Sequence, residues 1–97
     1  MTLPLTLIAT LTTRQDPSPA LHEALRSLIA ATREEPGCLQ YDLHQQPDNP
    51  RVLVMIEQWR DAAALIAHQA TAHYGQFGQR CGPLLETVVL QHLQRIA

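Results

Sequence analysis

Cysteine and charged residues are both scarce in this chain of 97 residues, and each shortage excludes a class of protein. The two cysteines, Cys38 and Cys81, are too few for the disulfide framework of a small secreted domain, so we interpret both as free thiols. Charged residues make up 16% of the chain, the net charge is -2, and no run of basic residues occurs. Because binding to a phosphate backbone depends on clustered lysine and arginine, we expect no nucleic-acid partner.

Long apolar segments are absent as well. No apolar run approaches the roughly 20 residues that span a bilayer, so no membrane partner is expected. The apolar start, residues 1–11, lacks the basic region and the small-residue cleavage site of a signal peptide. We therefore expect a cytoplasmic protein with a single domain over residues 1–97.

Motifs for cofactors and metals are also missing. The chain contains no Gly-x-Gly-x-x-Gly, Walker A, Cys-x-x-Cys or His-Glu-x-x-His sequence, so nothing indicates a flavin, nicotinamide or nucleotide cofactor. Five histidines are present, but a metal site needs three or four converging ligands, and no pair has a recognisable spacing. We expect neither a cofactor nor a metal.

Hydrophobic periodicity and turn residues divide the chain into six main elements and one short helix. They predict strand 3–13, a helix from Pro19 that ends near Glu35, strands 38–46 and 51–59, helix 62–69, a short helix 72–81 and strand 84–96. Ser18 and Asp61 are expected as helix N-caps. The order strand, helix, strand, strand, helix, strand is typical of an α+β, ferredoxin-like split βαβ fold, with helices on one face of an antiparallel sheet.

Alternation and helical spacing also predict which side chains face the core. The first helix carries an apolar stripe of Leu21, Ala24, Leu25, Leu28 and Ile29. Thr32 takes the next place on that stripe, near the helix end, where a polar residue is easily tolerated. In strand 38–46 the same reasoning places Leu39, Tyr41 and Leu43 on one face.

Strand 51–59 is apolar on both faces, with Val52, Val54 and Ile56 on one and Leu53, Met55 and Trp59 on the other. Helices can cover only one of these faces, and water on the second would favour polar residues there. We expect a second copy of the chain to cover it, making a homodimer. The alternative is that long loops or the last strand fold over the exposed side.

Glu57 is a carboxylate within this apolar strand. A buried charge needs a partner or water, so Glu57 either pairs with an arginine or a backbone N–H near the dimer contact, or takes part in a site. Trp59, two residues on, lies on the same side and could belong to the core or to that site.

Four stretches together resemble the antibiotic biosynthesis monooxygenase family, and within it the bacterial quinol monooxygenases. They are EEPGCLQY at 34–41, VMIEQW at 54–59, LIAH at 65–68 and TAHY at 71–74. The resemblance implies a dimeric α+β barrel with two sheets packed face to face and a site between helices and sheet. It also implies oxygenation of electron-rich aromatic substrates without flavin, haem or metal. The haem-degrading branch has an asparagine in strand one, where this chain has Leu11, so haem degradation is not expected.

The resemblance places Trp59, His73 and Tyr74 in the site, and we expect these three to be catalytic. We also expect five residues to bind the substrate: Tyr41, His44, Glu57, His68 and Phe77. His73 would be the base, since an unperturbed pKa of about 6.5 suits proton abstraction at neutral pH. Trp59 would form an apolar wall, while Tyr74 and Tyr41 would hydrogen-bond the substrate oxygens.

The sequence thus predicts a cofactor-independent monooxygenase whose partners are a small aromatic substrate, a quinol or polyphenol, and dioxygen. Two alternatives stay open at this stage because a fold does not fix its chemistry. One is an isomerase or degradation enzyme for a small signalling molecule. The other is a non-catalytic dimeric binding protein.

Overall fold

The computed structural model describes residues 3–97, which form four strands and three α-helices. In chain order they are β1 (Leu5–Thr13), α1 (Pro19–Arg33), β2 (Cys38–Gln46), β3 (Asn49–Trp59), α2 (Ala62–Gln69), α3 (Ala72–Cys81) and β4 (Leu85–Leu93), with a 3₁₀ turn at Gly82–Leu84 before β4. No helix in this part of the chain is both long enough and apolar enough to cross a bilayer.

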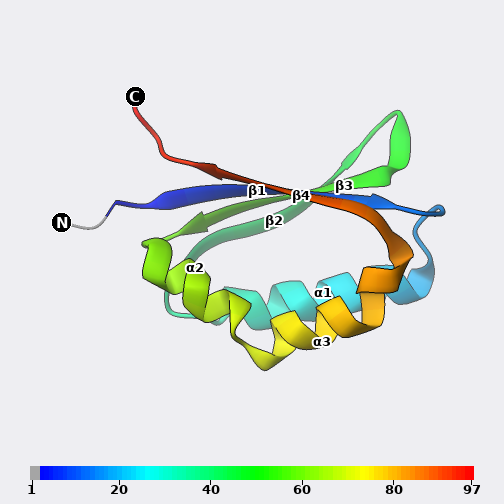
Figure 1. Cartoon of the computed structure of the whole chain (residues 1–97), viewed down its shortest axis with the longest axis horizontal. Helices are drawn as coiled ribbons and strands as arrows, with labels where there is room; N and C mark the ends of the chain where they lie inside the picture. The colour runs from blue at the N-terminus through cyan, green and yellow to red at the C-terminus, as the bar shows by residue number, and fades with distance from the viewer. Residues whose placement is uncertain (1–2) are drawn as a thin grey trace.

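The strands make one antiparallel sheet in the order β2-β3-β1-β4, and all three helices lie under the same face of it (Figure 1). This arrangement confirms the α+β, ferredoxin-like fold. It also means that β1 and β3, the two central strands, present one face to the helices and the other to the outside.

Side-chain caps fix where the helices begin. Ser18 Oγ accepts a hydrogen bond from the Leu21 backbone N–H at 3.1 Å, and Asp61 Oδ1 accepts one from Ala64 at 2.8 Å. Both caps were predicted. Thr71 adds a third cap by accepting from Tyr74 N–H at 3.3 Å, which keeps α2 and α3 as two separate helices.

The core lies between the helices and the inward face of the sheet. It is built largely from alternate residues of β1 and β3 and from one stripe of α1: Leu7, Ala9, Leu11, Leu53, Met55, Trp59, Leu21, Leu25 and Leu28. On the outward face Ile8, Val54 and Ile56 are half-buried, and no helix of the described chain covers them. The expectation of a strand with two apolar faces is therefore confirmed for β3.

One expectation about facing was wrong. Leu39 does not join Tyr41 on the inward face, because a β-bulge between Cys38 and Gln40 leaves it unpaired and 57% exposed. Thr32 takes the place on the core stripe of α1 that its spacing predicted, and it is completely buried there.

Element ends also differ from the expected bounds. β1 starts at Leu5 instead of Leu3, and β4 spans Leu85–Leu93 because the 3₁₀ turn occupies the expected first residue. β3 begins earlier, at Asn49, and takes in Pro50. This proline is tolerated because the ladder with β1 reaches only Val52, so no β1 carbonyl needs its missing N–H.

Candidate active site

A cavity of about 210 Å³ lies between the inward face of the sheet and the helices. Its walls are mostly aliphatic or aromatic. The eighteen lining residues come from all four strands and all three helices: Leu7, Ala9, Leu11, Leu25, Leu28, Tyr41, Met55, Glu57, Leu65, His68, Gln69, Tyr74, Phe77, Gly78, Gly82, Leu85, Val88 and Leu90.

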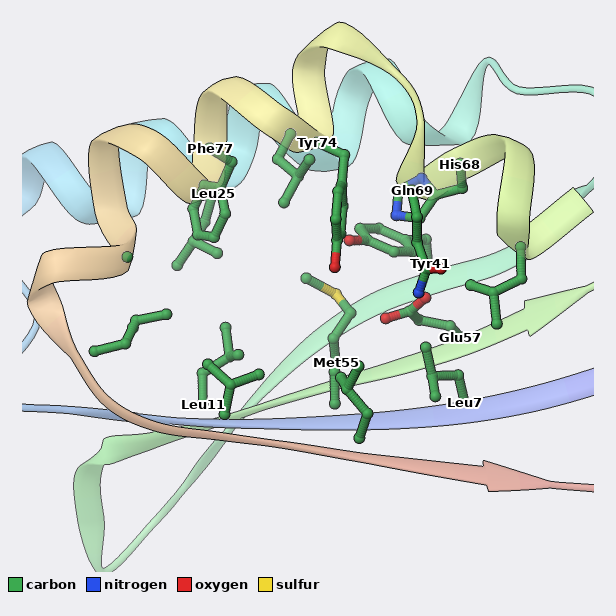
Figure 2. Close-up of a pocket in the computed structure, with 18 residues that line it drawn as sticks. Leu7, Leu11, Leu25, Tyr41, Met55, Glu57, His68, Gln69, Tyr74 and Phe77 are labelled. Carbon is green, nitrogen blue, oxygen red and sulfur yellow. The ribbon is translucent and has the colours of Figure 1, made fainter.

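The polar side chains gather at one end of this cavity. Figure 2 shows Tyr41, Glu57, His68, Gln69 and Tyr74 converging there, while the opposite end is purely apolar. A ligand with oxygen atoms on one side and a hydrocarbon body on the other matches this division.

Glu57 points inward from β3 and is 3% exposed. The indole N–H of Trp59 donates a hydrogen bond to its Oε1 at 3.0 Å. Burial raises the pKa of Glu57 to about 7, with a smaller increase from the charge of Glu35, and the Trp59 hydrogen bond works in the opposite direction. Glu57 is therefore poised between its neutral and ionised forms at neutral pH.

Two tyrosine hydroxyls also line the polar end. Burial raises the pKa of Tyr41 and of Tyr74, and the negative charge of Glu57 adds to both shifts. Both phenols thus keep their protons at neutral pH and can donate hydrogen bonds to a ligand oxygen.

His68 projects from α2 and is almost fully buried against aromatic rings. Its ring centroid lies 4.6 Å from Trp59, 5.0 Å from Tyr74 and 5.5 Å from Tyr41. Burial lowers the pKa of His68 below its usual 6.5, although Glu35 opposes this shift. The imidazole is consequently neutral at physiological pH.

Glu35 lies behind His68, away from the cavity lining, and holds two histidines at once. Its Oε2 atom is 2.7 Å from His68 Nδ1 and 2.8 Å from His73 Nε2. Within residues 3–97 these three residues are also a group that could hold a metal ion, since their potential ligand atoms all lie within 4.8 Å of one another. A metal ion there would have to compete with both hydrogen bonds.

The structure brings five of the eight expected site residues to the cavity wall: Tyr41, Glu57, His68, Tyr74 and Phe77. Trp59 is fully buried behind Glu57 and His68, so it supports them and does not form the wall. His73 faces Glu35 and a shallow hollow between α1 and α3. His44 lies opposite Val54 on the outward face of the sheet, away from the cavity.

Sequence reasoning missed Glu35 and Gln69. Gln69 follows Leu65 by four residues on α2, so the helical repeat that brings Leu65 to the cavity could have identified it. Glu35 lies 33 residues before His68 in a connection between elements, and only the fold brings the two together.

One protein family model matches most of the chain. The family model described as "Antibiotic biosynthesis monooxygenase" matches residues 4–80. The matched segment includes Glu35, Tyr41, Glu57, His68 and Tyr74.

Individual relatives agree with this match. "Putative monooxygenase Rv0793" of Mycobacterium tuberculosis is 38% identical over 85 residues, 88% of this chain and 83% of that protein. The solved structure of PA3566 from Pseudomonas aeruginosa has a TM-score of 0.91 and 48% identity, covering 100% of this chain and 98% of that one. The structure of Rv0793 has a TM-score of 0.88 and 34% identity, covering 97% and 96% of the two chains.

Proposed function

The chain belongs to the antibiotic biosynthesis monooxygenase family, and from this premise we propose that it oxidises a single-ring quinol or polyphenol with dioxygen, without a resident cofactor. The observation that carries the proposal is the apolar cavity with hydrogen-bonding side chains at one end. The name of the Mycobacterium tuberculosis relative supports a monooxygenase-like role.

The size of the cavity supports a one-ring substrate. A cavity of about 150 Å³ lined by aliphatic side chains is enough to bind benzene, and this one measures about 210 Å³. The aliphatic end would hold the hydrocarbon edge of the ring. The hydroxyls of Tyr41 and Tyr74 would donate hydrogen bonds to the substrate oxygens.

The chemistry needs little from the protein beyond orientation and a base. Removing the proton from a substrate hydroxyl leaves an electron-rich phenolate. This anion can pass one electron to dioxygen, giving a substrate radical and superoxide, which combine into a peroxide on a ring carbon. The C–H bond at that carbon and the O–O bond then break, which leaves one oxygen atom on the ring as a quinone oxygen. The other oxygen leaves as water, with the C–H proton and the proton first taken from the substrate hydroxyl.

Residues that line the cavity and residues behind its wall both have roles in this scheme. Glu57 would bind a substrate oxygen in either protonation state, since its pKa of about 7 leaves both populated. Trp59 would hold Glu57 and His68 in place from behind. Phe77 would contact the ring from α3. His73, which the sequence suggested as the base, faces Glu35, so its role would be exerted through that carboxylate.

We also propose that the protein works as a homodimer in the cytoplasm. The half-buried apolar face of the sheet, which includes Ile8, Val54 and Ile56, supports the dimer. The location remains a prediction from the sequence.

Oxygen uptake with a panel of one-ring quinols and no added cofactor tests the function. The chain offers a matched pair of variants on α3. A side chain at Gly78 would enter the cavity without meeting any atom within 4 Å of its Cβ, and Gly75 has equal free space away from the cavity. We expect Gly78→Leu to lose at least tenfold in kcat/KM, because its side chain occupies the space of the ring, and Gly75→Leu to keep wild-type turnover.

A quinol that binds without oxygen uptake would indicate a binding protein, and turnover that consumes no oxygen would indicate an isomerase. Equal activity in the Gly78→Leu and Gly75→Leu variants would remove the cavity from the reaction.

A further inference from the structure

The hydrogen bonds between Glu35 and the two histidines determine which ring nitrogens of His68 and His73 carry a hydrogen. A carboxylate oxygen can only accept hydrogen bonds. The ring nitrogens that face Glu35 Oε2, Nδ1 of His68 at 2.7 Å and Nε2 of His73 at 2.8 Å, must therefore both carry a hydrogen.

This fixes the tautomer of His68. A neutral imidazole carries one hydrogen, so placing it on Nδ1 leaves a free lone pair on Nε2. The two nitrogens point to different sides of the ring, and Glu35 occupies the Nδ1 side. The hydrogen bond that the His68 ring forms within residues 3–97 is the one through Nδ1, and the side chain lines the cavity.

The charges around His68 suit a proton acceptor. The groups that face it are Tyr41 from β2, Tyr74 and His73 from α3, and Glu35 from the connection after α1. Of these, Glu35 is the anion in direct contact, so a proton arriving on Nε2 would create an imidazolium ion hydrogen-bonded to a carboxylate. That pairing stabilises the charged ring inside an apolar site.

We infer that His68 is the proton acceptor of the reaction proposed above, that Glu35 is its positioning residue, and that His73 holds Glu35 in place. The step rests on the proposed function. The substrate O–H bond breaks, its proton moves to His68 Nε2, and its electron pair stays on the substrate oxygen. The same proton later moves from Nε2 to the outer peroxide oxygen, which leaves as water with a second proton from the C–H bond of the oxygenated ring carbon. The imidazole of His68 is then neutral again.

The other two candidates for the proton acceptor, His73 and Glu57, are less suited to this role than His68. His73 has its Nε2–H committed to Glu35 and does not line the cavity. Glu57 lines the cavity, but the hydrogen bond from Trp59 occupies its Oε1 atom, and no carboxylate is bonded to it that could stabilise a transferred proton.

The tautomer can be observed without any substrate. In protein labelled with ¹⁵N-histidine, long-range ¹H–¹⁵N NMR at pH 7.5 should show one imidazole with its hydrogen on Nδ1, the minor form of free histidine. Its signal should vanish in His68→Gln and persist in the control His22→Gln, which changes a residue in the first turn of α1 that does not line the cavity. Glu35→Gln should shift this ring toward the Nε2–H form. Finding hydrogen on Nε2 of His68 in the wild-type protein would overturn the inference.

Steady-state oxygen uptake with an accepted quinol supplies the second readout. His68→Gln should lower kcat by about 10²–10⁴-fold. Glu35→Gln should lower kcat by about tenfold or more with little change in KM, because it alters the orientation and charge of the base and leaves the cavity wall intact. Full turnover by His68→Gln, with loss in Glu57→Gln, would assign the base to Glu57 and reject the inference. A wild-type protein with the expected tautomer and no oxygen uptake with any quinol would reject the proposed function and leave the Glu35–His68 positioning intact.

Discussion

Burial of Glu57 makes its ionised form unfavourable and also places its carboxyl group at the cavity. The residue is 3% exposed, and its carboxyl group accepts a hydrogen bond from Trp59 at 3.0 Å. Because ionisation in this surrounding is unfavourable, burial raises the pKa of Glu57 from 4.5 to about 7. A group whose pKa is higher in the folded state than in the unfolded state favours folding below the unfolded pKa, and that advantage is lost as the pH rises through the folded pKa.

Glu57→Gln should therefore change the pH dependence of stability. The amide cannot ionise, yet its oxygen can still accept the Trp59 hydrogen bond. The free energy of unfolding of the variant, relative to wild type, should rise by about 2–3 kcal/mol between pH 5 and pH 8, since each pKa unit corresponds to about 1.4 kcal/mol. Urea denaturation at the two pH values measures this difference.

An exposed carboxylate provides the control for that experiment. Glu23 lies on the solvent side of α1, and Glu23→Gln should keep the wild-type pH dependence. If the difference between Glu57→Gln and wild type stayed constant from pH 5 to pH 8, Glu57 would not titrate in the folded protein as described.

Strand alternation alone predicts which strand residues face the site. Glu57 and Tyr41 could be predicted as inward-facing because each shares its parity with apolar residues of its own strand, Met55 and Leu43. The bridge between Glu35 and His68 could not, because it joins a loop to a helix 33 residues away and depends on how α2 packs after the chain has folded. His44 was misplaced for the opposite reason: its residue type suggested chemistry, while its parity places it on the outward face.

Gly37 determines how closely α2 can approach the start of β2. Its position just after α1 suggests a turn that only glycine could make, yet no described glycine has a positive φ angle, so its conformation is open to any residue. What it provides is space: a Cβ atom at Gly37 would lie 2.3 Å from the Cβ of Ala64 on α2. Only a residue without a side chain lets α2 lie this close to the start of β2.

Gly37→Ala should destabilise the fold by about 1–3 kcal/mol, because α2 would have to move to relieve the clash. Thermal unfolding followed by circular dichroism measures the loss. Gly75→Ala on α3 is the matched control. With nothing within 4 Å of its Cβ, it should raise stability by about 0.5–1 kcal/mol through helix propensity. Unchanged stability of Gly37→Ala would mean that the contact between α2 and β2 is looser than the structure shows.

Element identities were predictable from periodicity and caps, and element ends were less so. All seven helices and strands were expected, since Ser18 and Asp61 cap helices and alternation marks the strands. The bulge at Leu39 and the 3₁₀ turn at Gly82–Leu84 were not, because both arise from fitting a strand end to its neighbour and leave no distinct pattern in the sequence.

The whole molecule is a thin two-layer slab that leaves one side of its sheet bare. Its extents are 43 × 30 × 18 Å, and its accessible surface is 6302 Å². A compact monomer of this mass exposes about 5,500 Å². Part of this excess accessible surface comes from apolar residues on the outward side of β4, where Val89 is 52% and Leu93 is 47% exposed.

We expect this bare face to be buried in a homodimer, and a charge at its centre should prevent assembly. Ile56 lies on the outward face of β3, paired with Ile8 on one side and Asp42 on the other. A lysine at this position could remain solvated in a monomer but would lose its hydration between two packed sheets, at a cost of several kcal/mol. Sedimentation equilibrium should therefore show a dimer for wild type and a monomer for Ile56→Lys. Gln79→Lys, which adds the same charge to the exposed side of α3, should remain dimeric. A folded wild-type monomer at micromolar concentration would contradict the dimer, because the sheet would then be stable with its apolar face in water.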